Sequence, residues 1–380
     1  MTKFFFIIFL LNLIFLEKAY SFDTTAKQAI VYDYQTKSII FEKNSKELVS
    51  PSSMSKIMTL YYLFKKIKEG EVLLTDQFKV SKKAWKKGGS RMFVNLNSLV
   101  SVEDLIRGII VQSGNDACIV VAEAISGSEE AFADELNILA EEIGLKNSNF
   151  KNSTGWPDPE HLMTVEDLLT LTIKTIEDFP EFYHYYSEKE FTYNKIKQIN
   201  RNPMLFSNLV SDGLKTGHTS LGGYGLVASV VKDDRRVIVI LNGLKSSKRR
   251  ASESEKLAKV AINQYSNIVI ADKNEVLKSL NVWNGKKKLL DVVSQEDLII
   301  TIPKKIKNQI SIFIKHKRPL LAPIKEGQIV AELIVKKKNT EMKIAQFNLH
   351  AKDNINKISF FPKIYYNFKY LILGDSIFSE

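Results

Sequence analysis

The 380-residue sequence has one cysteine, five histidines and no apolar run long enough to cross a bilayer. Cys118 has no partner for a disulfide within the chain, and its apolar neighbours indicate a buried small side chain rather than a catalytic thiol. No group of His, Cys, Asp and Glu has the spacing of metal ligands. These absences exclude a disulfide-stabilised fold and predict that the protein binds no metal and no cofactor.

The net charge of +11 comes mostly from lysines, which are scattered along the sequence rather than gathered in blocks. Scattered lysines indicate a solvated surface, and attraction to an anionic polymer or a membrane surface is the alternative. No basic stretch is interleaved with aromatic residues. We therefore expect no binding of nucleic acid.

The first 21 residues have the pattern of a secretory signal peptide. Lys3 precedes an apolar run over residues 4–16, which at about 13 residues is too short to span a bilayer comfortably. The run ends at Ala19-Tyr20-Ser21, with small residues at the two positions that signal peptidase reads. Cleavage would make Phe22 the N-terminus, so the protein is predicted to be exported and to act outside the cytoplasm.

The most informative motif is Ser53-Met54-Ser55-Lys56, at the start of an apolar stretch that continues to Phe64. On a helix, side chains three residues apart share a face, so Lys56 would lie one turn from Ser53. The stretch is apolar on nearly every side, which predicts a buried helix, and a buried lysine tends to lose its charge. A neutral amine can take the serine proton, so the pair predicts a nucleophile that needs no histidine.

The same spacing occurs twice more, and the local pattern argues against both copies. Ser229 and Lys232 lie in a β-branched run typical of a strand, where an odd spacing puts two side chains on opposite faces. Ser148 and Lys151 run into a turn-rich segment over residues 152–157, with no helix to align them. Only Ser53 has a suitable scaffold.

Two further motifs follow in order. Ser113-Gly114-Asn115 comes after an apolar helix predicted to begin at residues 101–104, where Ser, Val, Glu and Asp have the pattern of a capping box. Lys215-Thr216-Gly217-His218-Thr219 follows the turn signal Asp212-Gly213 and precedes strand-like runs. The three motifs match the Ser-x-x-Lys, Ser-Asp-Asn and Lys-Thr-Gly set of β-lactamases and penicillin-binding proteins, with Gly114 in place of the aspartate.

The order of the motifs and their flanking residues resemble the D-alanyl-D-alanine carboxypeptidases, the low-molecular-mass penicillin-binding proteins. The similarity includes residues 112–117, 190–194, 200–202, 212–219, 223–229, 253–257 and 322–328. The last segment resembles the second domain of that family. The resemblance implies a serine peptidase that removes the terminal D-Ala from peptidoglycan stem pentapeptides through an acyl-enzyme, and that β-lactam antibiotics inhibit by acylation.

The resemblance also implies a role for each motif residue. Ser53 would attack the carbonyl of the penultimate D-Ala, and Lys56 is the expected general base. Ser113 would relay a proton to the departing amine, with Lys215 holding it in place. Asn115 would hydrogen-bond the substrate amide and steady Lys56.

Strand residues and two loops complete the predicted site. The backbone N–H groups of Ser53 and His218 would form the oxyanion hole, by resemblance to the family. Gly217 has no side chain, so a substrate backbone could lie against that strand. Residues 88–90 are expected to form a flexible loop near the nucleophile. His161 falls where the family has a loop bordering the site, and we expect it to support the site rather than react.

A carboxypeptidase must also recognise a free carboxylate, which the planar fork of an arginine matches. Arg250 aligns with the carboxylate-binding position of the family. Thr216 and Thr219 can add hydroxyl donors. Arg201 is a second candidate, and an ordinary ion pair is its alternative role.

The pattern of apolar runs predicts an α+β fold. Residues 51–182 are mainly helical, and another helix is expected over 253–265. The sequence also predicts two strand hairpins, 29–34 with 38–42 and 224–231 with 236–242. Strands at both ends with helices between them give an antiparallel sheet flanked by helices. This agrees with the β-lactamase/transpeptidase-like fold that the resemblance implies.

The sequence is predicted to divide into a signal peptide (1–21), a catalytic domain (22–266), a small all-β domain (267–352) and a tail (353–380). Short apolar runs broken by turns predict the β domain, whose role stays open among stalk, spacer and partner binding.

The tail repeats apolar residues every three or four positions, with Pro362 suited to the first turn of a helix. Its aromatic residues, near Lys363 and Lys369, favour a helix lying in the membrane interface, as is frequent in the family. An element that closes the β domain is the alternative. The protein is accordingly predicted to be periplasmic and attached to the outer face of the cytoplasmic membrane.

Three other functions compete with the carboxypeptidase. A serine β-lactamase shares the three motifs, and class A enzymes add a glutamate between the second and third. Glu166 lies in that interval, but within a predicted helix start over residues 164–167, which argues against water activation. A D,D-endopeptidase would use the same mechanism with room beyond the leaving D-Ala. A non-catalytic wall-binding protein would lack a motif residue, and none is missing.

Overall fold

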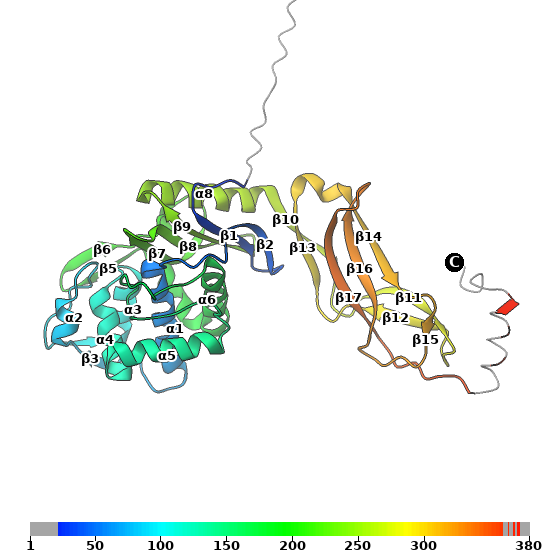
Figure 1. The fold of residues 1–380 in the computed structure, drawn as a ribbon, viewed down its shortest axis with the longest axis horizontal. Coiled ribbons are helices and arrows are strands. Elements are labelled where there is room, and N and C mark those ends of the chain that lie inside the picture. Colours follow the sequence, from blue (N-terminus) through cyan, green and yellow to red (C-terminus); the bar gives the residue numbers. More distant parts are fainter. Residues whose placement is uncertain (1–21, 360–363, 365–367, 369–370, 373–380) are drawn as a thin grey trace, which may run out of the picture.

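The computed structural model describes residues 22–359, 364, 368 and 371–372. The predicted signal peptide and most of the predicted tail helix lie outside these residues. A part built from helices and a sheet, which holds the three motifs, is joined to a second part built almost wholly from strands (Figure 1). The predicted α+β class and the separate β domain are therefore confirmed.

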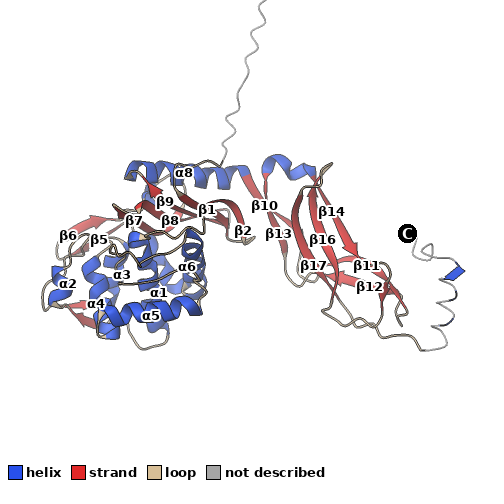
Figure 2. Cartoon of the chain, viewed as in Figure 1, coloured by secondary structure: helices blue, strands red, loops and turns tan. Residues whose placement is uncertain are grey.

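A five-stranded antiparallel sheet forms the centre of the first part, in the order β2-β1-β9-β8-β7. Its strands are β1 (Gln28–Asp33), β2 (Ser38–Lys43), β7 (Ser211–Thr219), β8 (Gly223–Lys232) and β9 (Arg235–Leu244). The central strands β1, β8 and β9 are buried along most of their length, because helices cover both faces of the sheet (Figure 2). Both predicted hairpins are present.

One face of the sheet packs against α8 (Ser247–Gln264), in a core that includes Val239 and Leu257. The opposite face packs against the larger helical core, which includes Ile240 and Leu60. Its helices are α1 (Lys56–Lys68), α2 (Lys82–Lys86), α3 (Val102–Ile110), α4 (Asn115–Ser126), α5 (Glu129–Glu142), α6 (Val165–Asp178) and α7 (Pro180–Tyr183). Two small two-stranded sheets pair β3 (Gln77–Lys79) with β4 (Leu99–Ser101) and β5 (Glu190–Tyr193) with β6 (Ile196–Ile199). Three 3₁₀ turns are η1 (Ser52–Ser55), η2 (His184–Ser187) and η3 (Pro203–Phe206).

Helix starts follow the predicted caps, with one correction. The Ser101 and Thr164 hydroxyls accept the backbone N–H of the third residue beyond each, as expected for N-caps of α3 and α6. The helix predicted over 253–265 starts at Ser247 instead, capped by Ser246. The prediction was wrong because the first turn, Ser-Lys-Arg-Arg, carries no apolar residue from which a helical period could be read.

The second part contains a six-stranded sheet in the order β14-β16-β17-β12-β11-β15, with a separate pair β10-β13. Its elements are β10 (Tyr265–Ala271), β11 (Val276–Trp283), β12 (Leu289–Val293), β13 (Leu298–Pro303), η4 (Lys304–Gln309), β14 (Ile310–His316), β15 (Leu320–Leu321), β16 (Ile329–Lys337) and β17 (Lys343–Ala351). A core of its own, with Leu280, Val292 and Leu333, fills this part. Beyond it, Ile364, Phe368, Leu371 and Ile372 are helical and exposed.

Asp33, at the end of β1, joins the two parts. Its carboxylate is fully buried, accepts Arg235 Nε at 2.6 Å and accepts Asn267 Nδ2 of β10 at 3.0 Å. Arg235 Nη1 donates to the carbonyls of Ala261 and Tyr265, where α8 passes into β10. The ion pair therefore ties together the sheet, the end of α8 and the first strand of the β part.

We expect Asp33→Asn to lower the free energy of unfolding by about 3 kcal/mol, because it leaves the Arg235 guanidinium buried without its anion. The matched control is Asp353→Asn, whose carboxylate is exposed and lies 3.5 Å from Lys287 Nζ. That pair should contribute less than about 1 kcal/mol. Urea denaturation of the three proteins measures both values, and equal losses would contradict the role of Asp33.

Candidate active site

Ser53 lies in η1, a single 3₁₀ turn that leads directly into α1. The predicted helix is thus correct in place, but its first turn is 3₁₀. Among residues 51–64, Ser53 is the one side chain that is not buried. The turn approaches residues 152–156 so closely that a Cβ on Gly155 would lie 2.0 Å from the carbonyl oxygen of Ser52. The nucleophile therefore sits on a tightly held turn with one side chain open to solvent.

The Lys56 amine is fully buried and meets three different segments. Its Nζ lies 3.0 Å from Ser53 Oγ, 2.8 Å from Asn115 Oδ1 and 2.5 Å from the carbonyl oxygen of Thr154. All three contacts are neutral oxygens, so no carboxylate balances an ammonium charge at this point. Burial lowers the pKa of Lys56 from 10.5 to about 8, because the charged form loses its hydration. A fraction of the amine is therefore neutral near pH 7 and can accept the Ser53 proton.

A second buried amine completes the site. Lys215 Nζ lies 2.9 Å from Ser113 Oγ and donates to the carbonyl of Thr216 at 3.1 Å. Its pKa is well below the usual value, first because it is buried and then because Lys56 lies nearby. Ser113 has a left-handed backbone, with φ of 58°. Two Ser–Lys pairs thus meet in one site, built from three motifs spread over residues 53–215.

Asp116, which the sequence analysis did not single out, fixes the second motif. Its carboxylate accepts the backbone N–H groups of Met92, Phe93 and Val94 at 2.8, 2.9 and 3.3 Å. The neighbouring Asn115 donates to the carbonyl of Gly88 at 2.9 Å, which leaves its Oδ1 turned to Lys56. The loop 88–90 therefore borders the site, as predicted, and helps to orient the amide.

Gly217 lies where β7 passes the nucleophile turn. A Cβ at this position would meet the Pro51 carbonyl oxygen at 2.9 Å and Met54 Cγ at 3.1 Å. The missing side chain thus lets β7 pack against the nucleophile turn. Thr219 Oγ1 also contacts this turn, 2.9 Å from Ser52 Oγ. Thr216 is buried beside Lys215.

The two arginines lie together. Arg250 Nη2 donates to the carbonyl of Arg201 at 3.3 Å, and its guanidinium lies over the Tyr224 ring, which stacks on His218 with centroids 3.9 Å apart. Within the described part of the chain neither arginine forms an ion pair, and Arg250 Nε is buried without a partner. Burial lowers the pKa of Arg250. A mostly buried cation without an anion is suited to bind one.

Some site contacts had no sequence signal. Thr154 reaches Lys56 through its backbone carbonyl, which any residue could supply. His161 is buried, accepts the N–H of Lys151 through Nδ1, and has its pKa lowered to about 4 by burial, so it supports the wall of the site in neutral form. Glu166 lies in the first turn of α6, as predicted, and does not contact Ser53 or Lys56.

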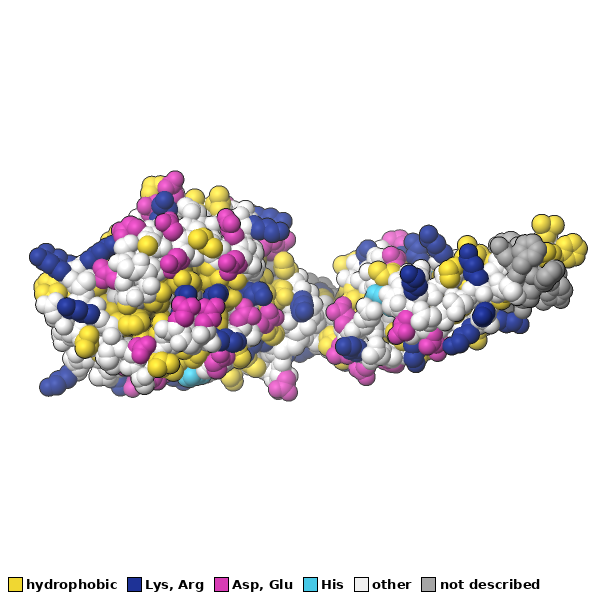
Figure 3. Space-filling model, turned by 90° about the horizontal axis from the view of Figure 1, so that it is seen from below, with side chains coloured by type: hydrophobic (Ala, Val, Ile, Leu, Met, Phe, Trp, Pro, Cys, Tyr) yellow, Lys and Arg dark blue, Asp and Glu magenta, His cyan; other side chains and the backbone are white. Residues whose placement is uncertain are grey.

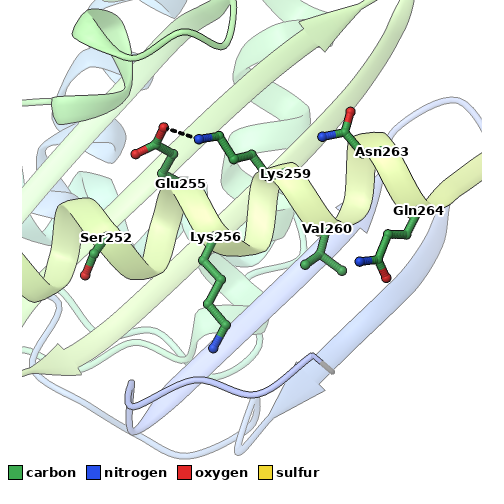
Figure 4. A pocket seen from close by; sticks show the side chains of 7 residues that line it. All are labelled: Ser252, Glu255, Lys256, Lys259, Val260, Asn263 and Gln264. Atoms are coloured by element: carbon green, nitrogen blue, oxygen red, sulfur yellow. Dashed lines mark ion pairs between the residues drawn. The ribbon is translucent and has the colours of Figure 1, made fainter. Parts of the chain in front are cut away.

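A groove of about 490 Å³ runs along α8, away from these residues (Figure 4). Its polar groups are occupied by neighbours: Lys259 pairs with Glu255 at 2.6 Å, and Lys256 donates to the Asp23 carbonyl at 2.5 Å.

Among the described residues no group of three or more His, Cys, Asp and Glu could hold a metal ion. Nor does this part of the chain contain a helix both long and apolar enough to span a bilayer.

The fold and the paired Ser–Lys geometry are those of serine peptidases of the Ser-x-x-Lys type. Residues 16–245 match the family model D-alanyl-D-alanine carboxypeptidase, and residues 265–357 match the C-terminal domain of penicillin-binding protein 5. The chain belongs to the D-alanyl-D-alanine carboxypeptidase family.

Relatives from several bacteria support this assignment. The chain is 36% identical over 348 residues to D-alanyl-D-alanine carboxypeptidase DacC of Escherichia coli (strain K12), covering 90% of this chain and 86% of that protein. The crystal structure of penicillin binding protein 5 from Haemophilus influenzae matches with a TM-score of 0.79 and 34% identity, over 88% of this chain and 98% of that one. The structure of DacD from Francisella tularensis matches with a TM-score of 0.80 and 31% identity, over 88% and 95%.

The lowered pKa of Lys56 predicts how acylation by a β-lactam depends on pH. Only the neutral amine can accept a proton, so the acylation rate should rise about tenfold per pH unit below pH 8 and level off above it. Stopped-flow labelling with a fluorescent penicillin measures this profile. Lys56→Arg, which keeps its charge, should lose at least about 100-fold in rate at every pH. A rate that is flat or falls through pH 8 would exclude Lys56 as the base.

Proposed function

We propose that this protein removes the terminal D-Ala from peptidoglycan stem peptides that end in D-Ala-D-Ala, through an acyl-enzyme on Ser53. The observation that carries the proposal is the buried Lys56 amine, 3.0 Å from Ser53 Oγ on the one half-buried side chain of the nucleophile turn and without a carboxylate to keep it charged. The names of the relatives support the same substrate.

The mechanism follows from the proposed roles. Lys56 takes the proton of Ser53 as its oxygen attacks the carbonyl of the penultimate D-Ala. The backbone N–H groups of Ser53 and His218 stabilise the oxyanion that forms. Ser113, held by Lys215, relays the proton that Lys56 took to the leaving D-Ala amine as the C–N bond breaks. Water then hydrolyses the ester, and one of its protons returns to Ser53. Asn115 binds the substrate amide with its Nδ2 and keeps Lys56 in position.

Ser53→Ala should abolish both covalent labelling by fluorescent penicillin and release of D-Ala from a D-Ala-D-Ala peptide. Ser148→Ala is the matched control, because Ser148 belongs to the other non-strand Ser-x-x-Lys and hydrogen-bonds Asp167 instead. It should keep both activities. If wild type loses its penicillin label rapidly, releases hydrolysed drug and frees no D-Ala from the peptide, the protein is a β-lactamase. Folded wild type with neither activity would favour a non-catalytic wall-binding protein.

Endopeptidase action is a second candidate, because the chain is also 27% identical over 240 residues to the D-alanyl-D-alanine endopeptidase of Escherichia coli (strain K12). A carboxypeptidase differs by recognising a free carboxylate, and the unpaired Arg250 favours that function. We propose that Arg250 binds the terminal carboxylate and that Arg201 helps to hold it there through its backbone carbonyl. The hydroxyls of Thr216 and Thr219 contribute to the same subsite.

Peptides with a free or an amidated C-terminus test this assignment. Wild type should prefer the free carboxylate, and Arg250→Gln should lower kcat/KM for it by about 100-fold while leaving the amide nearly unchanged. Arg201→Gln keeps the backbone carbonyl that Arg250 contacts and should have the smaller effect. A larger loss of kcat/KM with Arg201→Gln would make Arg201 the residue that binds the carboxylate and Arg250 the one that holds it in place. Equal kcat/KM for both peptides with wild type would favour the endopeptidase.

We also propose that the protein is exported and that its tail lies in the membrane interface on the outer face of the cytoplasmic membrane. The four described tail residues are apolar, helical and 54–84% exposed, as expected for a helix face that binds outside the folded protein. Deletion of residues 360–380 is one arm of the vesicle experiment below.

A further inference from the structure

The positive charge of the protein is concentrated in the β domain. Residues 22–264 contain 32 Lys and Arg against 31 Asp and Glu, whereas residues 265–357 contain 18 against 9. The lysines are scattered along the sequence, as the sequence analysis found, but their excess belongs to the part without catalytic residues. A solvated surface needs no such imbalance, so the alternative of an anionic partner gains support.

Several of these charges lie where the tail leaves the β domain. Lys286, Lys287 and Lys288 follow Gly285, which forms a β-bridge with Lys357, three residues before the tail segment 360–380. Lys286 N also donates to the Asn356 carbonyl at 2.8 Å. The short strand β15 pairs in parallel with the end of β11 that leads into this turn. Lys317 and Arg318 precede β15, and Arg318 lies further back along β11, in a pocket that Lys278 also lines. We call Lys286–Lys288, Lys317, Arg318 and Lys357 the distal basic surface.

The distal basic surface is open and nearly free of counter-charges. All six side chains are exposed, and within the described residues only Lys287 has an ion pair, at 3.5 Å to Asp353. On the face drawn in Figure 3, Lys and Arg side chains gather on the β domain. By contrast, most ion pairs of the described chain lie in the catalytic part.

Apolar side chains are interleaved with these charges. Leu289, next to Lys288, is 51% exposed, and Leu321 of β15 is 61% exposed. A hydrophilic polymer would gain little from these side chains. A bilayer interface suits both kinds, because lysine stems lie against apolar surface while their ammonium groups meet lipid phosphates.

We propose that the distal basic surface binds the anionic headgroups of a phospholipid bilayer, as a membrane contact separate from the tail. The proposal rests on the export of the protein but not on insertion of its tail. Because the catalytic part lies at the opposite end of the molecule (Figure 1), two contacts at one end would hold the catalytic part away from the bilayer.

Co-sedimentation with vesicles tests the proposal, using the mature chain and the same chain ending at Ser359. The shorter chain keeps its fold, because the three cores end at Ile355. It should bind vesicles containing phosphatidylglycerol at low salt, release them at high salt, and bind neutral phosphatidylcholine vesicles far more weakly. The full chain should bind both kinds more tightly.

Two triple substitutions locate the contact. Lys286→Gln, Lys287→Gln and Lys288→Gln together should weaken binding of the shorter chain to anionic vesicles about 100-fold. The control is Lys304→Gln, Lys305→Gln and Lys307→Gln in η4, which removes the same charge from exposed positions of the same domain. It should change binding less than about threefold.

If the two triple variants lose the same amount of binding to anionic vesicles, net charge alone explains the effect and the proposal is overturned. Absence of binding by the shorter chain, equal binding to neutral vesicles, or salt-sensitive binding to purified peptidoglycan in place of vesicles would also overturn it. Penicillin labelling should be unchanged in every variant. It therefore separates a failure of this proposal from a failure of the proposed enzymatic function, which would remove labelling from wild type as well.

Discussion

The burial of one amine is the constraint on which the site depends. Lys56 is enclosed by the nucleophile turn, by Asn115 at the start of α4 and by the Thr154 carbonyl, and each offers it a neutral oxygen. A carboxylate in any of these places would hold the amine charged and prevent it from acting as a base. The folding energy of the helical core therefore offsets the cost of a desolvated lysine, and the lowered pKa is the functional result.

The rest of the catalytic part keeps this environment rigid. Strand β7 approaches the nucleophile turn because Gly217 has no side chain, and the segment 152–156 approaches it from another direction because Gly155 has none. Asp116 accepts four backbone N–H groups, those of Met92, Phe93, Val94 and Ala117, so its carboxylate ties residues 92–94 to the start of α4 without touching Lys56. Close backbone packing thus excludes solvent from the amine while leaving Ser53 open.

The catalytic residues lie in one part of the molecule, and most of the net positive charge lies in the other. The catalytic part is nearly neutral overall, and its catalytic residues lie among neutral hydrogen-bond partners. The β domain carries most of the net positive charge on exposed side chains. Asp33 and Arg235 connect the parts through a buried ion pair at the end of α8, so the orientation of one part is coupled to the other.

The sequence by itself determined the three motifs, their order, both strand hairpins, the helix caps at Ser101 and Thr164 and the all-β second part, because these depend on local pattern. It also indicated which of three Ser-x-x-Lys copies lies on a helix. It misplaced the start of α8, whose first turn is polar. Only the tertiary structure decided that Thr154 contacts Lys56, that Arg250 has no ion-pair partner among the described residues and that the turn before Lys286 pairs with Lys357. These features arise where residues distant in sequence pack together, often through backbone atoms that every residue shares, so no local pattern could encode them.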